Sequence, residues 1–347
     1  MDLKLPYLLK PYNICHFNDS IFYIGNRKVF PKEKSFYACS NCKEIANALK
    51  LMITQGGAPL QVALTSFRYI ASEMQKEHIK FNFNNLKKEI MYIVKARVTN
   101  TTMKRCVEKI LKHYEIRFSD SHYDINTFIK EINKTIDQIE SDYNKLYCNM
   151  GQYGASLIKD GDKILTTCFA EHTFLLSIYY AKLANKKVKV YVNETRPYFQ
   201  GIRLTAPSLY ELGIDVKIIS DSMGSFLMQS GEITHYMSGA DLVCMDGSVV
   251  NKIGTNQNAI CAKYYNIPYT AFSMAPDKSK KSFKDVEMEY RDPKELLMID
   301  NEYIGDKNIS AIYPAFDIIR EDLVTNIVTN KGIFKPNEIK EVVSWMQ

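Results

Sequence analysis

The chain has 347 residues, of which 46% are apolar and 24% are charged, a composition typical of a folded protein rather than a disordered one. This length exceeds what one small core accommodates, so we expect two domains. The net charge is only +6 and the basic residues are scattered, which argues against the clustered basic face of a nucleic-acid-binding protein.

The chain carries no signal for a membrane or an oxidising compartment. No apolar run reaches the roughly 18 residues that a membrane helix needs, and the opening MDLKLPYLLKPYN lacks a signal-peptide core. The eight cysteines include one Cys-x-x-Cys, Cys39 to Cys42, without a second pair or a nearby histidine. We therefore expect a cytoplasmic protein with reduced thiols, no metal and no membrane partner.

The first third of the chain predicts a mainly helical domain. Its first 35 or so residues suit a small β element, and Asn41 with Glu44 forms a capping-box-like helix start. Gly56 and Gly57 end that helix, and Pro59 can open the next. Further helices are predicted at 85–95, 101–113 and 125–147. We divide the chain into a mainly helical domain (1–122), a connecting helix (123–150) and an α/β domain (151–347).

From residue 161 the pattern changes to alternating strands and helices. The predicted strands are 163–167, 188–192, 216–220, 242–245 and 268–272, and the helices between them are 171–183, 204–213, 223–230 and 254–266. Two more helical segments are predicted at 321–329 and 336–345. Such alternation predicts a Rossmann-like, doubly wound parallel sheet, in which residues just past the strands line a shared crevice.

Two residues beside these strands are candidates for acid–base chemistry. Cys168 follows the strand KILTT near a helix N-terminus, where the helix dipole lowers a thiol pKa, although a buried structural cysteine is the alternative. His172, one turn away, could tune that thiol. Asp241 begins the apolar run DLVCM, and apolar surroundings raise a carboxyl pKa and favour a protonated general acid. A helix cap or a structural acceptor is the alternative for Asp241.

The segment 247–255, GSVVNKIGT, predicts a loop entering a helix. Free backbone N–H groups, the Lys252 cation and the Asn251 amide would cradle a phosphate there. Arg97 and Gln200, which lie next to predicted element ends, could join it, or could instead form surface salt bridges. The motifs GxGxxG, GxxxxGK[ST], HExxH and GxSxG are absent, which removes the simplest dehydrogenase, NTPase, metalloprotease and hydrolase interpretations.

Two long segments carry a family resemblance. The runs RPYFQGIRLTAPSLYELGIDVKIISDSMG and GADLVCMDGSVVNKIGT resemble the signature of methylthioribose-1-phosphate isomerases, a family related to the regulatory subunits of initiation factor 2B. The resemblance extends to GDKILTTC, YRDPKEL, GGAPL and KARVTNTTM, and so covers nearly the whole chain.

This resemblance implies a cofactor-independent homodimer that converts 5-methylthioribose 1-phosphate, a sugar phosphate of methionine salvage, into the ketose 1-phosphate. Cys168 and Asp241 match the family's catalytic cysteine and aspartate. Arg97, Gln200, Asn251 and Lys252 match the family's positions that hold the substrate, chiefly its phosphate. Gly56 and Gly57 lie in the GGAPL run, which matches a further substrate-binding motif of the family.

The chain departs from the family in three motifs. RGAP becomes Gly56-Gly57-Ala58-Pro59, RPTAVNL becomes RVTNTTM, and Asn-Ala-Gly after the cysteine becomes Phe169-Ala170-Glu171. Loss of one charged phosphate contact costs about 1.5–3 kcal/mol. The departures leave 5-deoxyribose 1-phosphate and ribose 1,5-bisphosphate open as substrates, and a non-catalytic regulatory subunit remains the alternative function.

Overall fold

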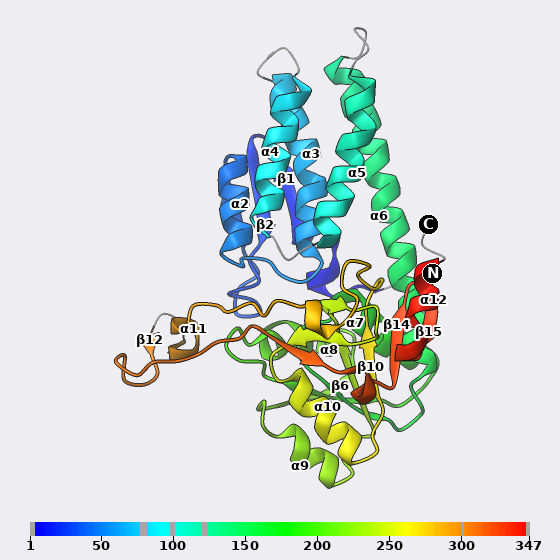
Figure 1. Ribbon diagram of the computed structural model, residues 1–347. Helices are drawn as coiled ribbons and strands as arrows, with labels where there is room; N and C mark the ends of the chain where they lie inside the picture. The colour runs from blue at the N-terminus through cyan, green and yellow to red at the C-terminus, as the bar shows by residue number, and fades with distance from the viewer. Residues whose placement is uncertain (1–3, 77–81, 98–100, 119–123, 300–301, 345–347) are drawn as a thin grey trace. The chain divides into compact units, whose positions relative to one another are not determined.

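The computed structural model describes residues 4–76, 82–97, 101–118, 124–299 and 302–344 (Figure 1). The chain forms two compact units, Met1–Asn144 and Lys145–Gln347. Helix α6, Ile125–Ser156, runs through the boundary and ends later than the predicted 147. The domain limits at 122 and 150 stay a prediction, and residue 122 lies outside the described residues.

The first unit opens with a small antiparallel sheet, as predicted. The short helices η1 (Tyr7–Leu9) and α1 (Pro11–Ile14) precede the strands β1 (Cys15–Asn18), β2 (Ile21–Gly25) and β3 (Phe36–Cys39), which pair in that order. Helix α2, Cys42–Lys50, follows because the Asn41 side chain accepts a hydrogen bond from the backbone N–H of Glu44 at 3.0 Å. The predicted helix cap is thus confirmed.

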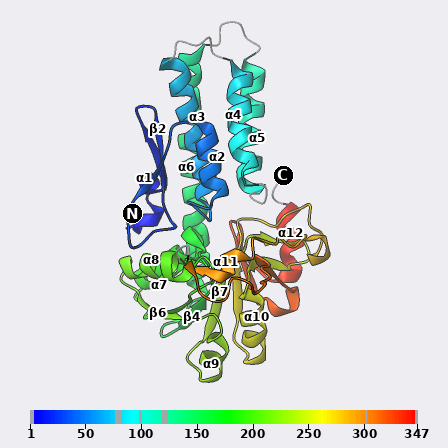
Figure 2. The same cartoon turned by 90° about the vertical axis from the view of Figure 1, so that its left-hand side faces the viewer.

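Four longer helices complete this unit. They are α3 (Ala58–Lys76), α4 (Phe83–Lys95), α5 (Thr101–Arg117) and the first part of α6, and both ribbon views show them running alongside one another (Figures 1 and 2). One apolar cluster joins sheet and helices, with Phe22, Phe67, Ile90 and Phe128 almost wholly buried. The predicted helices are confirmed, and the segment Val98–Asn100 of the RVTNTTM motif lies outside the described residues.

The second unit is built on a seven-stranded sheet. Its strands are β4 (Lys163–Thr166), β5 (Lys189–Asn193), β6 (Asp215–Ile219), β7 (His235–Gly239), β10 (Tyr269–Phe272), β14 (Asn326–Thr329) and β15 (Gly332–Phe334). Their order is β15-β14-β10-β7-β4-β5-β6, and every pair is parallel except β14 with β15. The predicted fold class is confirmed.

The strand order reverses beside β4. The chain first proceeds outward through β5 and β6, and then returns to place β7 on the other side of β4. In a doubly wound sheet of this kind, ligands bind outside the carboxyl ends of the strands at the point of reversal. The topology therefore marks the ends of β4 and β7 as the place to look for a site.

The remaining helices of this unit fill the crossovers and pack on the sheet. They are α7 (Glu171–Leu183), the π-helical η2 (Gly201–Thr205) continued by α8 (Ala206–Glu211), α9 (Gly224–Gln229), α10 (Thr255–Tyr264) and α12 (Ile339–Ser344). One core joins Leu165, Tyr236 and Ala271 of the sheet to Met228 and Ala259 of the helices. The end of α6 approaches α7 closely, since a Cβ at Gly154 would lie 2.1 Å from Ser177 Oγ.

Two predicted elements are wrong. The run 242–245 is not a strand of the main sheet, because β7 takes that place and Leu242–Val243 (β8) joins β9 (Val249–Lys252) and β13 (Phe316–Ile319) in a small antiparallel sheet. The β7 segment HYMSG holds buried His235, which hydrogen-bonds Thr270 at 2.9 Å, so it lacks the apolar pattern of a buried strand.

The predicted helix 321–329 is instead the short η4 (Glu321–Leu323) followed by β14, whose β-branched run Ile327, Val328 and Thr329 suits a strand. The predicted helix 336–345 is η5 (Pro336–Glu338) with α12, and residue 345 lies outside the described residues. The other short elements are η3 (Phe283–Asp285), α11 (Lys294–Leu297), β11 (Met298–Ile299) and β12 (Glu302–Tyr303).

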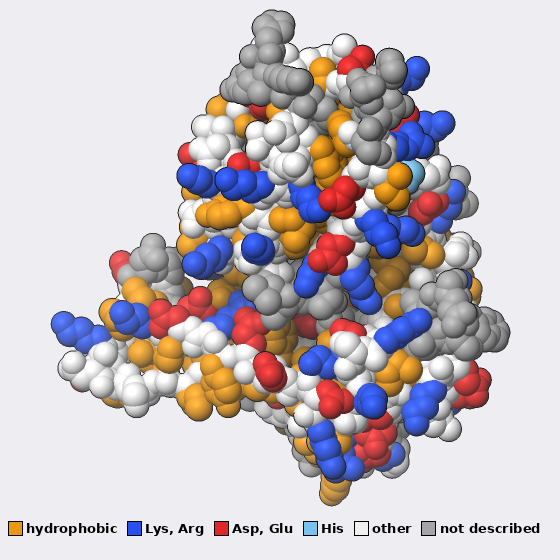
Figure 3. Space-filling view, turned by 45° about the horizontal axis from the view of Figure 1, so that its top comes forward, with side chains coloured by type: hydrophobic (Ala, Val, Ile, Leu, Met, Phe, Trp, Pro, Cys, Tyr) orange, Lys and Arg blue, Asp and Glu red, His pale blue; other side chains and the backbone are white. Residues whose placement is uncertain are grey.

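The helices in the described ranges include none that combines the length and apolar character needed to cross a bilayer. On the face shown in Figure 3, basic and acidic side chains of the described residues are interspersed.

Candidate functional site

The candidate residues of the second unit gather at the carboxyl edge of the sheet. Cys168 lies two residues beyond β4, and Asp241 lies two residues beyond β7, on either side of the strand-order reversal. Thr195 and Asp221 lie two residues beyond β5 and β6. Four neighbouring parallel strands thus deliver polar side chains to one edge, at the place where the topology predicts a ligand.

Cys168 is a free, half-buried cysteine surrounded by enough protein to desolvate its thiolate. Burial raises the pKa of Cys168 to about 11; Lys252 opposes this rise, and the negative charge of Asp241 adds to it. The predicted lowering of this pKa by the helix dipole is therefore wrong, because desolvation outweighs the favourable charges. The thiol is protonated at neutral pH.

Lys252 supplies the positive charge of the site. It is only 4% exposed, and burial lowers its pKa, against the opposing influence of Cys168 and Asp241. Its ammonium donates a hydrogen bond to Tyr313 Oη at 3.2 Å and lies 5.2 Å from the ring of Tyr198 and 5.6 Å from that of Phe316. Within the described part of the chain, no carboxylate lies at ion-pairing distance from this ammonium. A buried cation that meets no carboxylate among the described residues is suited to bind an anionic ligand.

Asp241 stands beside the strand that carries Lys252. Its backbone N–H donates to Val250 O at 2.8 Å, and its charge raises the pKa of the Cys168 thiol and opposes the lowering of the pKa of Lys252. The residue is exposed, so the apolar surroundings expected for it are not what the structure gives. The reason is that Asp241 precedes β8 at the rim of the sheet rather than starting a buried strand.

A carboxylate takes part of the backbone cradle predicted for phosphate, and phosphate binding there stays a prediction. The Asp317 carboxylate accepts hydrogen bonds from the backbone N–H groups of Gly254 at 2.7 Å and Asn256 at 2.9 Å, and so occupies the N-terminus of α10. Asn251 is buried, and its amide donates to Thr255 Oγ1 at 3.0 Å. Of the groups expected in this segment, the Lys252 ammonium and the second N–H of the Asn251 amide retain donor capacity for an anion.

Gln200 is buried where the segment after β5 enters η2. The turn requires glycine at the next position, because a Cβ on Gly201 would lie 1.7 Å from Asn193 O. This close approach fixes η2 against the end of β5, and so keeps Gln200 at the same edge as Cys168.

The other predicted residues belong to the first unit. Gly56 is exposed at φ +68°, a left-handed conformation that favours glycine. Gly57 follows it, and Arg97 donates to Met52 Sδ at 2.7 Å, which places it beside the segment leading to these glycines. Buried Arg27 donates to Gln55 O and holds the same segment, a role that the sequence did not suggest.

Three residues of the second unit were also missed. Tyr313 and Tyr198 surround Lys252, and Thr195 contacts the backbone of Cys168. Tyrosine and threonine have no distinctive spacing, and only the position of Thr195 just past a strand gave any signal. His172, expected to tune Cys168, stacks on Tyr147 with ring centroids 4.5 Å apart.

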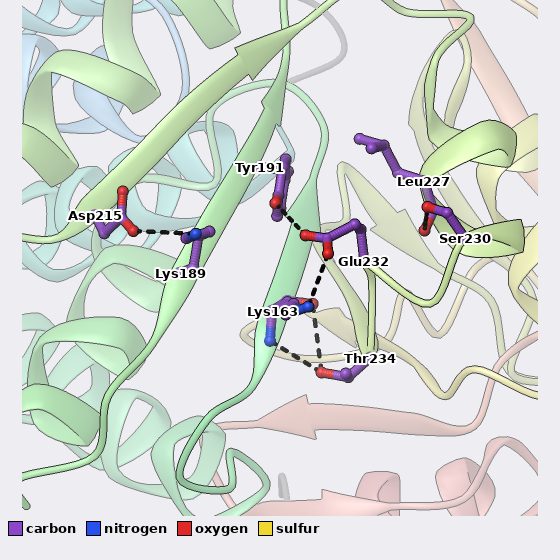
Figure 4. Close-up of polar contacts among 8 residues, drawn as sticks. All are labelled: Lys163, Lys189, Tyr191, Asp215, Leu227, Ser230, Glu232 and Thr234. Atoms are coloured by element: carbon purple, nitrogen blue, oxygen red, sulfur yellow. Dashed lines mark hydrogen bonds and ion pairs between the residues drawn. The ribbon is translucent and has the colours of Figure 1, made fainter.

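The opposite, amino edge of the sheet is lined with paired charges (Figure 4). Lys163 Nζ lies 3.0 Å from Glu232 Oε1, Tyr191 Oη donates to Glu232 Oε2 at 2.7 Å, and Lys189 Nζ lies 3.5 Å from Asp215 Oδ2. A cavity of about 450 Å³ opens beside them. Among the described residues, no group of three His, Cys, Asp or Glu side chains is placed to hold a metal ion.

Comparison with known proteins matches this arrangement to a family. Residues 55–336 match the model of the initiation factor 2 subunit family. The chain belongs to that family. Among curated relatives, the methylthioribose-1-phosphate isomerase of Thermosipho africanus is 34% identical over 92% of this chain and 93% of its own length. A putative methylthioribose-1-phosphate isomerase of Methanocaldococcus jannaschii is 33% identical over 90% of this chain and 92% of its own length.

Two solved structures share the whole architecture. The 5-methylthioribose 1-phosphate isomerase of Pyrococcus horikoshii has a TM-score of 0.81 at 25% identity, with 99% of this chain and 96% of that one covered. The translation initiation factor eIF-2B subunit delta of A. fulgidus has a TM-score of 0.78 at 28% identity, with 95% and 97% covered. The expected family and fold are confirmed.

Proposed function

We propose that this protein is an aldose–ketose isomerase that converts 5-methylthioribose 1-phosphate into 5-methylthioribulose 1-phosphate, a reaction of methionine salvage. The observation that carries the proposal is the pairing of Cys168 and Asp241 across the strand-order reversal, with the buried Lys252 cation close enough to influence both. Its sequence relatives named for this isomerase support the same activity.

Lys252 binds the phosphate in this proposal, because its charge is buried and meets no carboxylate among the described residues. Gln200 and Asn251 bind the sugar and the remaining phosphate oxygens from the same unit. Arg97 and the Gly56-Gly57 segment belong to the other unit, and their part in substrate binding stays a prediction from the family resemblance. In this proposal the isomerisation requires no metal or cofactor.

A phosphate on carbon 1 prevents spontaneous ring opening, so the ring oxygen must be protonated. Although Asp241 is exposed in the unit described, it donates that proton from its protonated form, and the bond between the ring oxygen and carbon 1 breaks. A Cys168 thiolate removes the carbon-2 proton, which forms a double bond between carbons 1 and 2. The proton then returns to carbon 1, and the carbon-2 hydroxyl proton passes to Asp241, which gives the ketose and restores both residues.

The alternative route moves a hydride directly from carbon 2 to carbon 1 after ring opening. Burial raises the pKa of Cys168 to about 11, so the proton route must first remove the thiol proton. In the hydride route carbon 2 loses a hydride instead of a proton, so no thiolate is needed, and the carbon-2 hydroxyl proton passes to the Asp241 carboxylate. Substrate deuterated at carbon 2 separates the routes. Complete retention of deuterium at carbon 1 supports hydride transfer, and exchange with solvent supports proton transfer.

Incubation of the purified protein with 5-methylthioribose 1-phosphate, followed by NMR, tests the proposal. We expect the carbon-1 methylene and the carbonyl of the ketose to appear. Turnover of only 5-deoxyribose 1-phosphate or ribose 1,5-bisphosphate would change the substrate and keep the reaction class. No turnover of any of the three would refute the isomerase.

The likeness to an eIF-2B delta subunit supports a second candidate, a non-catalytic regulatory subunit. Retention of both Cys168 and Asp241 favours the enzyme. Co-purification with translation factors, together with no isomerase activity, would favour the subunit. We further propose that the protein is a cytoplasmic homodimer, and light scattering on the purified protein tests the dimer.

A further inference from the structure

The backbone at Cys168 has an unfavourable conformation. Its φ is +66°, and Thr195 and Phe199 in the facing segment have φ of +63° and +56°. Residues other than glycine rarely adopt this left-handed region, and for the β-branched Thr195 it is a genuine outlier. Each such residue is energetically unfavourable and persists only where its surroundings hold it.

Two threonine hydroxyls hold Cys168, one at each of its backbone polar groups. The Cys168 N–H donates to Thr195 Oγ1 at 3.0 Å, and Thr205 Oγ1 donates to Cys168 O at 2.5 Å. Both threonines are 1% exposed, so water does not compete for these bonds.

Thr195 is itself fixed from two sides. Its hydroxyl proton is donated to Asn193 O at 3.0 Å, which leaves an oxygen lone pair to accept from Cys168. Its backbone N–H donates to Asp221 Oδ1 at 2.8 Å, and the N–H of Arg196 donates to Asp221 Oδ2 at 2.8 Å. A continuous chain of hydrogen bonds therefore runs from Asp221 through Thr195 to Cys168.

We propose that Thr195 and Thr205 are positioning residues that hold Cys168 in its left-handed conformation and thereby aim its thiol, with Asp221 anchoring Thr195. This inference rests on the proposed function, in which the Cys168 thiol acts on the substrate. A purely structural role would stabilise the fold without affecting the thiol.

Thr195→Val and Thr205→Val replace each hydroxyl by a methyl group of similar size. Ser208→Ala is the matched control, because the hydroxyl of buried Ser208 donates to Leu204 O at 2.7 Å in the same helical segment and not to Cys168. Thr195→Ser and Thr205→Ser retain the hydroxyl and serve as rescue variants.

Turnover is the first readout. We expect kcat to fall roughly 10- to 100-fold in each Val variant, since a displacement of about 1 Å costs up to that much. KM should change less than about threefold, because the Lys252 contact remains. Ser208→Ala and the Ser variants should keep kcat near that of the wild type.

The second readout is independent of the isomerase activity. Alkylation of the native enzyme with iodoacetamide, followed by peptide mass spectrometry, reports the thiol of Cys168 and, as an internal reference, that of half-buried Cys261. Release of the Cys168 backbone should increase its alkylation rate at least about tenfold in the Val variants and leave Cys261 unchanged.

Val variants that match Ser208→Ala in both kcat and Cys168 alkylation would overturn the proposal. So would Ser variants as impaired as the Val variants. If a Val variant fails to fold, the alkylation rate and kcat of the corresponding Ser variant decide. A wild-type protein without turnover would refute the isomerase, while the alkylation of Cys168 would still confirm or refute the positioning role.

Discussion

Both edges of the seven-stranded sheet carry lysines, but the lysines differ in burial and in the groups they face. At the amino edge, Lys163 and Lys189 are partly exposed and each faces a carboxylate, on Glu232 and Asp215. At the carboxyl edge, Lys252 is 4% exposed and faces the rings of tyrosine and phenylalanine instead.

The difference shows where the molecule stores free energy for binding. Exposed ion pairs are screened by water and contribute little to stability. A buried cation without a carboxylate partner is costly, and the cost is recovered when an anion binds. The strained backbone residues Cys168 and Thr195 lie at the same carboxyl edge. Backbone strain and a buried cation that meets no carboxylate among the described residues therefore coincide at one end of the strands.

The largest expected effect is the loss of the catalytic pair. Cys168→Ser and Asp241→Asn should each lower kcat by roughly 10²- to 10⁴-fold, the range for removal of a general acid or base. Cys261→Ser, which changes a half-buried free thiol on α10, is the control and should keep full activity. Steady-state kinetics measures this, and near-normal turnover in either variant would remove that residue from the mechanism.

Much of this edge was predictable from the sequence. The apolar runs located β4 and β5. Positions next to predicted elements, together with the family resemblance, singled out Cys168, Asp241, Gln200, Asn251 and Lys252. Asp317 was not foreseen, although it fills the helix N-terminus expected to hold phosphate. Its contact arises from pairing between β9 and β13, and such long-range pairing leaves no local pattern in the sequence.

The predicted direction of the Cys168 pKa shift was wrong for a related reason. The helix dipole is a local effect that a sequence pattern reveals, whereas desolvation depends on everything packed around the thiol. The β7 strand was missed because buried His235 satisfies its polarity through Thr270 of the adjacent strand. Both errors, the Cys168 pKa shift and the missed strand β7, thus arise from contacts that only the tertiary structure brings together.

His235 offers a test at the amino end of β7. Burial lowers its pKa from 6.5 to about 4, against the opposing charge of Asp162. The unfolded chain therefore binds more protons between these values, so stability is full above pH 6.5 and falls toward pH 4, by on the order of 3 kcal/mol. Urea unfolding across this range measures it. His235→Gln should lack this decline, and an identical decline in the variant would contradict the assignment.

Lys252→Met compares the two edges directly. Loss of a charged hydrogen bond to phosphate costs about 1.5–3 kcal/mol, so KM should rise roughly 10- to 150-fold. The urea midpoint should not fall, because the variant no longer buries a cation that meets no carboxylate among the described residues. Lys189→Met at the amino edge is the matched control and should leave KM unchanged. Equal effects of the two substitutions on KM would show that the edges do not differ in function.

The smallest expected effect lies in the cluster around Glu232. The hydroxyl of Tyr191, and then Lys163, lower the pKa of this carboxylate, so its contribution to stability is present above its unfolded pKa and is lost as the pH falls through the acid range. Because Glu232 and Lys163 are both partly exposed, salt screens their attraction. Glu232→Gln should shift the urea midpoint slightly at low salt and not at all at high salt, with kcat and KM unchanged. A change in KM would mean that the amino edge communicates with the site, and the contrast between the two edges would fail.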